Sequence, residues 1–584
     1  MKEINFLVAL IIYSICLQAQ DKYDQIWLFG HRPNKPIDYL GGSIMSFLHN
    51  EPELNYFVIN CDLVENASIC DSAGKLVAYT NGCAIYNSNH KIVPNGDTLN
   101  PGETYNNYCN GSNGFYPTRS LALALPGFSP DTFYFFHVGD DEDGNPGIVY
   151  MTTLLHSEMN GTRIITKNNI IGKTKVVSAI QAVRHGNGRD WWIILHQTLS
   201  NYFFKYLLTP TGITGPILQQ IGYKWTFSYW TSQAAFSPNG KWYSIMSESN
   251  GVHLFNFDRC TGLFSNYQEL VRPVNDTRFY PRGICFSPNS NYLYLSADFT
   301  LYQYELGPSN VSNSYTVIDT NDFFKLPYTF NSSFYQLMLG PDNKIYGNTS
   351  SQTNFLHVIH NPDNKGDACN FVQHDILLPS SYWQSMPNFP HYRMYELEDS
   401  PCDTLGINKL PIANWRYEID TLNRLNFNFT DLSYPNITSW SWTFGDSLSF
   451  NNESQEQNPK HEFSRNGKFN VCLTVTNKHG SHKLCKEITI GTVDANNEYI
   501  GISIFNSLQV TPNPIHEYLN IKITNYIPNK LKVYIYNELG VKVFSQHLKT
   551  GNNIVNTSFL ISGLYLFKFV EEEKYIKTCK IIKQ

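Results

Sequence analysis

An acidic segment of this sequence has side chains that could bind a metal ion. Residues 140–145 read DDEDGN, and clustered carboxylates of this kind can bind calcium. The segment lacks the residue order of an EF-hand loop and has no glutamate at the closing position. Calcium is therefore the one cofactor that the sequence leaves open. We favour the alternative, a solvated loop between strands.

The histidines occur singly, in turn or strand contexts. His185, His196 and His391 show no spacing that pairs them with a carboxylate or a second ligand. His185 lies in the polar turn 184–190, whose charged residues could hold a ligand or bridge neighbouring parts of the fold, and we favour bridging. No HExxH, GxSxG, P-loop or GxGxxG motif stands in a supporting context, and no CxxC occurs. We predict no catalytic residue, no cofactor-binding residue and no metal ligand.

The first twenty residues have the pattern of a signal peptide. Lys2 precedes the apolar run 6–12, and a short polar stretch follows before Asp21. The run is too short to span a bilayer. A buried N-terminal strand is one alternative, and Cys16 raises another, a lipoprotein, although Ile15 stands where a lipobox needs a small residue. No later apolar stretch approaches 18 residues, so we predict an exported protein without a transmembrane segment.

The cysteines are expected to form disulfides outside the cytoplasm. The sequence has 12 cysteines, and removal of Cys16 with the signal leaves eleven. Cys472 and Cys485 flank an apparent hairpin, in which adjacent strands bring paired Cβ atoms close to disulfide distance. We predict this bridge. Proximity along the chain suggests Cys83–Cys109, Cys260–Cys285 and Cys369–Cys402 as further pairs, with Cys579 as the unpaired thiol.

Residues 21–400 contain a loose internal repeat. Its clear copies, 234–248, 284–298 and 337–350, each combine a short apolar strand, a turn with proline followed by Asn or Asp, and an alternating strand. Weaker copies lie at 69–81, 126–139 and 183–196, so the turns recur roughly every 50 to 58 residues, the signature of propeller blades. Composition agrees, since 15% of the residues are aromatic and Tyr, Phe, Val and Ile favour strands.

We predict an all-β protein whose first domain, 21–400, is a β-propeller. Strand-like pieces within 24–60 and at 386–389 suggest that the two ends complete one shared blade, which leaves no sheet edge exposed. The count is then seven blades, with six as the alternative. Two consecutive sandwiches are the rival architecture, which explains the strands but not the regular turn spacing.

Three tryptophans of the propeller region could contact a sugar. A flat aromatic ring can cover one face of a pyranose, so an exposed platform at Trp191, Trp192 or Trp230 is one interpretation. We favour the other, in which these side chains pack between blades.

A compact block at 413–492 follows a linker at 401–412. In its motif Trp440, Trp442 and Phe444 alternate onto one face, and Gly445 with Asp446 supplies a turn. We expect the Asp446 side chain to cap this turn, in preference to a catalytic or calcium-binding role.

A second pattern completes this block. An NP-x-H-x-F turn at 458–463 precedes Phe469, Val471, Leu473 and Val475, whose period of two predicts a core strand. Together with the W-x-F-G-D segment, the pattern closely resembles a PKD domain. The resemblance implies an immunoglobulin-like β-sandwich that usually serves in spacing or adhesion.

The last block, 508–584, follows a linker at 493–507 and on its residues alone describes a small seven-stranded sandwich. Its motif positions are Pro512, Asn513, Pro514, Gly540, Gly563 and Tyr565, followed by a basic final strand. This order is similar to the type A sorting domain of the type IX secretion system, with Cys579 in the final strand as a departure. The resemblance implies the type IX machinery as partner and transport through the periplasm to the surface of a Gram-negative cell, ending in release or surface attachment. The alternative is an ordinary terminal adhesion domain.

Composition and resemblance together leave two functional hypotheses. The net charge of −6 gives no basic face for nucleic acid. The propeller resembles uncharacterised propellers found beside these two modules, on residues 81–102, 257–262, 286–289, 364–371 and 386–393, which implies architecture but no chemistry. We favour a non-enzymatic binding or adhesion protein whose propeller contacts an extracellular glycan or surface protein, with the PKD domain as spacer. The alternative is a secreted polysaccharide- or protein-degrading enzyme with an unrecognised site at the propeller funnel.

Overall fold

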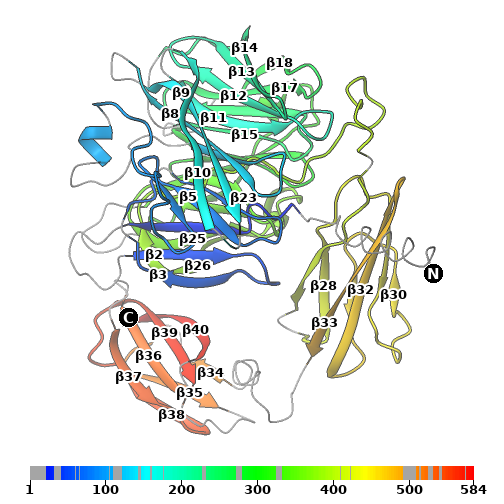
Figure 1. Ribbon diagram of the computed structural model, residues 1–584. Coiled ribbons are helices and arrows are strands. Elements are labelled where there is room, and N and C mark those ends of the chain that lie inside the picture. Colours follow the sequence, from blue (N-terminus) through cyan, green and yellow to red (C-terminus); the bar gives the residue numbers. More distant parts are fainter. Residues whose placement is uncertain are drawn as a thin grey trace.

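The structure is a computed structural model of the 584-residue chain. It describes residues 21–583 except 32–40, 60, 65, 104, 110–121, 142–145, 158, 160, 175–176, 227–231, 271–278, 324–331, 408, 421–422, 491–507, 512–514, 524–530, 538–541 and 572–573. The predicted signal peptide, 1–20, lies outside the described residues. Figure 1 shows the three folded units of the chain, which are built almost wholly from strands. No helix among the described residues is long and apolar enough to cross a membrane.

The first unit is a propeller in which the described residues form seven sheets, one for each predicted blade (Figure 1). The first two blades have three strands each: β1 (Ile26–His31), β2 (Gly41–Ser46) and β3 (Glu53–Phe57), then β4 (Ala67–Cys70), β5 (Leu76–Thr80) and β6 (Ile85–Asn87). The next three are β7 (Ala122–Pro126), β8 (Thr132–Asp140), β9 (Pro146–Ser157) and β10 (Gly161–Lys173); β11 (Val177–Arg184), β12 (Trp191–Gln197), β13 (Tyr202–Thr209) and β14 (Gly212–Gln220); and β15 (Ser232–Phe236), β16 (Trp242–Ser247), β17 (Gly251–Asp258) and β18 (Leu263–Leu270). The last two are β19 (Pro281–Phe286), β20 (Tyr292–Ala297), β21 (Thr300–Glu305) and β22 (Thr316–Thr320), and β23 (Phe334–Leu339), β24 (Ile345–Thr349), β25 (Thr353–Ile359) and β26 (Phe371–Tyr382).

The six repeated hairpins of the sequence form the first two strands of six blades. The turn at 237–241, for example, joins β15 to β16, and the turn at 287–291 joins β19 to β20. Short helical turns at Tyr105–Cys109, Val311–Ser314 and Gly366–Cys369 interrupt the loops. The regular turn spacing therefore predicted the blades correctly.

The first strands of the blades line the centre of the ring. β4 lies beside β7, β11 beside β15, and β15 beside β19, which lies beside β23. The ring closes where β26 packs against β1 and β2. There the Ser43 and Ser380 hydroxyls are 2.7 Å apart, and the Phe29 and Tyr382 rings lie 5.8 Å apart.

The predicted shared closing blade is wrong. The pieces near the N-terminus make a sheet of their own, and residues 386–389 belong to no strand. Instead, residues 385–395 run through the centre of the ring. The Asn388 side chain donates hydrogen bonds to the carbonyls of Ala122 (2.9 Å) and Ile180 (3.3 Å), and the Tyr392 hydroxyl donates to the Ala124 carbonyl (2.8 Å). Backbone polar groups of the inner strands thus find partners in this channel segment.

The second unit is a β-sandwich that corresponds to the predicted PKD block. One sheet contains β27 (Trp415–Ile419), β28 (Asn426–Asp431) and β31 (Lys460–Glu462), and the other contains β30 (Glu453–Ser454), β29 (Ser439–Thr443), β32 (Gly467–Asn477) and β33 (Gly480–Ile490). Trp415 and Trp442, one from each sheet, meet in the core with ring centroids 5.8 Å apart. The predicted core strand buries Phe469, Val471, Leu473 and Val475.

The third unit is a second small sandwich with the seven strands expected from the sequence. Its sheets are β34 (Leu508–Thr511), β35 (Tyr518–Ile523) and β38 (Gly551–Asn556), and β37 (Lys542–His547), β36 (Lys532–Asn537), β39 (Gly563–Glu571) and β40 (Lys574–Lys583). Its core is aliphatic and aromatic, with Ile521, Val533 and Phe567 among its fully buried side chains.

The sandwich at 413–492 is docked against the propeller. Asn50 exchanges two hydrogen bonds with the Tyr417 backbone (2.9 and 2.8 Å), and the Arg416 guanidinium donates to the Asp342 carbonyl (2.9 Å). At a second patch the Tyr395 and Tyr434 rings stack 5.8 Å apart. This sandwich therefore contacts the propeller at two places.

Candidate functional site

The funnel of the propeller is filled by the channel segment. Phe389 and Tyr392 are buried there, and Tyr392 packs edge-on against Trp191 and Tyr23. Beside the segment a cavity of about 50 Å³ remains, with room for a few waters at most. A sugar ring does not fit in this cavity.

The three histidines considered in the sequence, His185, His196 and His391, lie in separate places. The His185 ring contacts the Cys260 carbonyl of the next blade at 3.0 Å, whereas the Arg189 and Asp190 side chains pair within the turn and Arg184 donates to the Tyr392 carbonyl (3.3 Å). His196 packs between Phe203 and Trp225, and burial lowers its pKa to about 3. His391 lines the channel cavity, where burial and then the nearby arginines lower its pKa to about 3. The His196 and His391 rings are therefore neutral at physiological pH, and the three histidines do not form one site.

The two of these tryptophans that the structure describes, Trp191 and Trp192, pack inside the propeller, as favoured. Trp191 and Trp192 are 1% and 3% exposed, so neither can serve as a platform for a sugar. The Trp192 indole N–H donates to the Arg259 carbonyl across the blade boundary (2.9 Å). Trp230 lies outside the described residues.

The acidic segment is described only in part. Asp140 ends β8 and is buried, and Asp141 follows it, whereas residues 142–145 lie outside the described residues. Calcium binding there stays the untested alternative to the favoured solvated loop.

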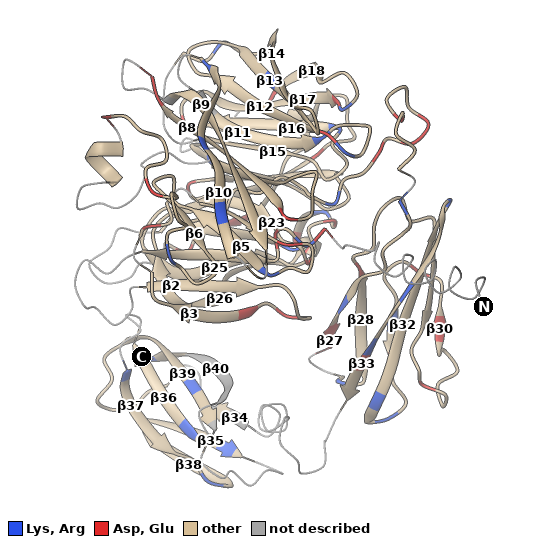
Figure 2. Cartoon of the chain, in the orientation of Figure 1, with Lys and Arg blue, Asp and Glu red and all other residues tan. Residues whose placement is uncertain are grey.

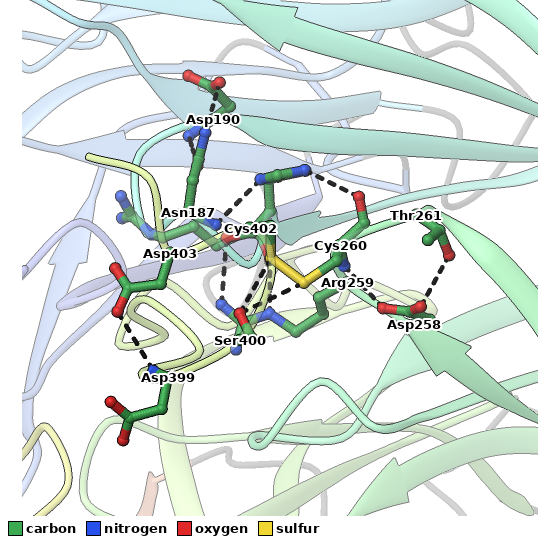
Figure 3. The surroundings of a disulfide bond; sticks show 12 residues. Asn187, Asp190, Asp258, Arg259, Cys260, Thr261, Asp399, Ser400, Cys402 and Asp403 are labelled. Carbon is green, nitrogen blue, oxygen red and sulfur yellow. Dashed lines mark hydrogen bonds between the residues drawn. A yellow bond between two sulfur atoms is a disulfide. The ribbon is translucent and has the colours of Figure 1, made fainter. Parts of the chain in front are cut away.

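Two predicted disulfides are present and two are wrong. Cys83–Cys109 and Cys472–Cys485 are bridged, and the latter pair lies directly across the β32–β33 ladder. Cys260 is bonded to Cys402 instead of Cys285, and Figure 3 shows this bridge with Arg259 and Ser400 beside it. The partners are 142 residues apart because the channel segment carries Cys402 back to the β17–β18 turn.

Four cysteines that the structure describes are reduced. Cys285 and Cys369, whose predicted pairings are wrong, share one hydrophobic cluster, and Cys61 and Cys70 share another. Burial raises the pKa of the Cys369 thiol to about 11, so this group is protonated and unreactive at physiological pH. Cys579 lies in β40, and its side chain is outside the description.

A polar groove lies between the blade of β15–β18 and the blade of β19–β22. The volume of this groove is about 890 Å³. Two repeated turns form one wall, and they touch where the Asn239 amide N–H donates to the Ser290 hydroxyl (3.2 Å). Within each turn a serine hydroxyl donates to an asparagine side chain, from Ser237 to Asn239 and from Ser287 to Asn289, both at 2.7 Å. These short hydrogen bonds within each turn hold the wall of the groove in one conformation.

Carboxamides dominate the groove. Six of them line it: Asn239, Asn256, Asn266, Gln268, Asn291 and Asn310. The Asn266 side chain donates to the Asn256 oxygen (2.7 Å), whereas the Asn256 Nδ2 is buried without a hydrogen-bond partner among the described residues. A carboxamide both donates and accepts, so such a surface suits a ligand that carries many hydroxyl groups.

Two aromatic rings and two opposite charges complete the groove. Trp242 and Tyr267 are half-buried, and Lys241 and Glu269 are exposed. Figure 2 shows basic and acidic positions interspersed over the blades. The groove therefore balances one cation with one anion and favours an uncharged ligand. Its residues come from two blades, and the sequence signal that could have found them is the pair of asparagine-rich turns.

The PKD motif residues have structural roles. Trp442 and Phe444 are buried and Trp440 is partly buried against the same core, while Gly445 has φ 71°, a conformation that glycine adopts without strain. Asp446 caps its turn through the Leu448 backbone, and it also accepts the Ser464 N–H and hydroxyl, both at 2.6 Å.

These contacts set the charge of Asp446. Burial disfavours its ionised form, but the hydrogen bonds from Ser464 and Leu448 and the nearby His461 outweigh that effect and lower its pKa. The carboxylate is fully engaged in holding loops together.

The motif of the last unit is described in part. Tyr565 is buried and its hydroxyl donates to the Ile561 carbonyl (3.0 Å), and Gly563 begins β39. Pro512, Asn513, Pro514 and Gly540 lie outside the described residues.

Family models match two segments of the chain. Residues 408–491 match the PKD domain, and residues 509–584 match the secretion system C-terminal sorting domain. The chain carries both domains. The PKD domain is the docked second unit, and the sorting domain directs the protein through the type IX machinery. The protein is therefore secreted or displayed on the surface of a Gram-negative cell. No curated protein matches the chain.

Solved structures resemble stretches of the protein of very different length. The PKD1 domain of Vibrio anguillarum Epp is 23% identical, with 15% of this chain and 99% of that chain covered and a TM-score of 0.13. The PKD1 domain of the Vibrio cholerae metalloprotease PrtV is 26% identical over 14% and 100% of the two chains, with a TM-score of 0.13. A putative 6-phosphogluconolactonase from Bacteroides uniformis is 12% identical over 81% and 97%, with a TM-score of 0.29.

Proposed function

We propose that this protein is a non-enzymatic extracellular binding protein that holds a neutral oligosaccharide in the groove between two propeller blades. The observation that carries the proposal is the lining of that groove, where six carboxamides stand beside Trp242 and Tyr267. Sugar hydroxyls pair with groups that donate and accept, and an aromatic face covers a pyranose ring.

The shape of the groove supports the same ligand class. A volume of about 890 Å³ falls in the range of small-molecule sites, of roughly 300–1,000 Å³, which a short oligosaccharide can occupy. The paired turns are braced by internal hydrogen bonds, so little conformational freedom is lost on binding.

The non-enzymatic part of the proposal rests on the state of the charged groups in the propeller centre. Asp24 pairs with Arg393, and the Arg259 guanidinium donates to the carbonyls of Arg184 and Tyr395. These groups hold the channel segment in place, so they are engaged in structure instead of facing a substrate.

A glycan array probed with the mature chain tests the proposal. We expect binding to neutral oligosaccharides, and the same glycans should be recovered intact after prolonged incubation. Release of shorter products would contradict the non-enzymatic role, and a preference for acidic glycans would contradict the groove as the site.

A further inference from the structure

Two glutamates and a histidine meet where the propeller joins the PKD domain. Glu396 and Glu398 follow the channel segment, and His479 lies in the turn between β32 and β33 of the PKD domain. One oxygen of each glutamate and one ring nitrogen of His479 all lie within 4.8 Å of one another. Three potential ligand atoms from two domains thus converge on one point.

The two oxygens of the Glu396 carboxylate differ in their hydrogen bonding. Its side chain is 5% exposed, and its Oε1 accepts the backbone N–H of Lys409 (3.1 Å). Its Oε2 is buried and has no hydrogen-bond partner among the described residues. A buried carboxylate whose hydrogen bonds are incomplete is costly, and a cation bound by Glu396 would compensate its charge.

The two oxygens of Glu398 have different partners. Its Oε2 pairs with the Lys478 ammonium (2.7 Å), while its Oε1 faces the His479 Nε2 (2.9 Å). A cation bound at Oε1 would replace the hydrogen bond to His479 and leave the Lys478 pair at Oε2 in place.

We propose that Glu396, Glu398 and His479 bind a divalent transition-metal ion, for which Zn²⁺ is the probe, and that this ion joins the PKD domain to the propeller. Imidazole and carboxylate together suit zinc, whereas calcium takes oxygen ligands only. Zinc–ligand bonds of about 2.0–2.2 Å place ligand atoms roughly 3.3 Å apart, so small side-chain movements bring the three atoms into position.

The expected consequence is a stiffer interdomain contact. The ion would link a segment locked into the propeller channel to a rigid hairpin turn of the PKD domain. It would therefore add to the Tyr395–Tyr434 stack and the Arg416 contacts without creating a new interface.

Isothermal titration of the tag-free mature chain with Zn²⁺ tests this site. We expect one ion per chain and a rise in melting temperature on saturation. Glu396→Gln and His479→Gln should each weaken zinc affinity at least tenfold. The matched control is His360→Gln, which alters a histidine–carboxylate pair elsewhere, 3.2 Å from Asp375, and should leave zinc affinity unchanged.

His479→Gln changes a turn residue outside both cores, so it keeps the test valid if Glu396→Gln fails to fold. The absence of stoichiometric zinc uptake by the unmodified chain would overturn the proposal. Wild-type affinity in the His479 variant would overturn it too, as would calcium binding of equal strength at the same site.

Discussion

Arg393 of the channel segment and Asp24, just before β1, form a buried bidentate ion pair. Their side-chain atoms are 2.9 and 2.5 Å apart, and the two side chains are 13% and 7% exposed. The pair joins residues 369 positions apart in the sequence. It attaches the channel segment to the first blade and so helps to hold the closed ring together.

Arg393→Met should destabilise the propeller strongly. Removal of one partner leaves the Asp24 carboxylate buried and uncompensated, which costs about 3–5 kcal/mol. We expect the melting temperature of the propeller to fall by several degrees in differential scanning calorimetry. Lys365→Met, which breaks the exposed pair with Glu305, should leave it unchanged, and equal melting of the two variants would refute this role for Arg393.

The Cys260–Cys402 bridge should contribute more stability than the Cys472–Cys485 bridge. Loop-closure entropy grows with loop length, and the two bridges close loops of 142 and 13 residues. That model predicts about 5 kcal/mol for the long loop and about 3 kcal/mol for the short one. Paired serine variants compared by urea unfolding measure the difference. A larger loss for the Cys472/Cys485 variant would show that chain entropy does not dominate.

Acid should weaken the propeller below about pH 6.5. Burial lowers the pKa of His137 to about 3 and that of His253 to about 4, against about 6.5 in an unfolded chain. Between these values the unfolded chain binds protons that the native state excludes, so stability is complete above pH 6.5 and is lost as pH falls toward 4.

The slope is up to about 1.4 kcal/mol per pH unit for each such histidine. Melting curves at pH 7.5, 6 and 5 should show the loss, and His253→Gln should make it smaller. An unchanged slope in that variant would mean that carboxylates alone govern the acid response.

Deletion of residues 508–584 should strand the protein in the periplasm. The sorting domain is a separate sandwich with its own core, so its removal leaves the propeller and the PKD domain folded. Fractionation of cells that express the truncated chain measures this, with the full chain as control. Surface display of the truncated chain at the normal level would contradict the role of the domain.

The sequence predicted local patterns well. The turn at 237–241 and its repeats predicted the blades because each hairpin is continuous in sequence. Cys472 and Cys485 could be paired because the hairpin between them fixes the register. The alternation of Trp442 and Phe444 likewise revealed a sandwich core.

Contacts between residues that lie far apart in the sequence could not be predicted from such local patterns. Residues 385–390 are all buried in succession, without the alternation of a half-buried strand, and the sequence alone does not show that a channel encloses them. The Cys260–Cys402 bridge depends on that path and could not be predicted without it. The groove is likewise made by two blades whose turns meet only in the folded ring.

The central claim is that the groove between two blades binds a neutral oligosaccharide. Calorimetric titration of the array-selected glycan against Trp242→Ala, with Tyr292→Ala as control, tests it most directly. Tyr292 begins β20 as Trp242 begins β16, but it is not part of the groove lining. We predict at least a tenfold loss of affinity, about 1.4 kcal/mol, for the Trp242 variant and none for the Tyr292 variant. Equal affinity of the two variants would contradict the account.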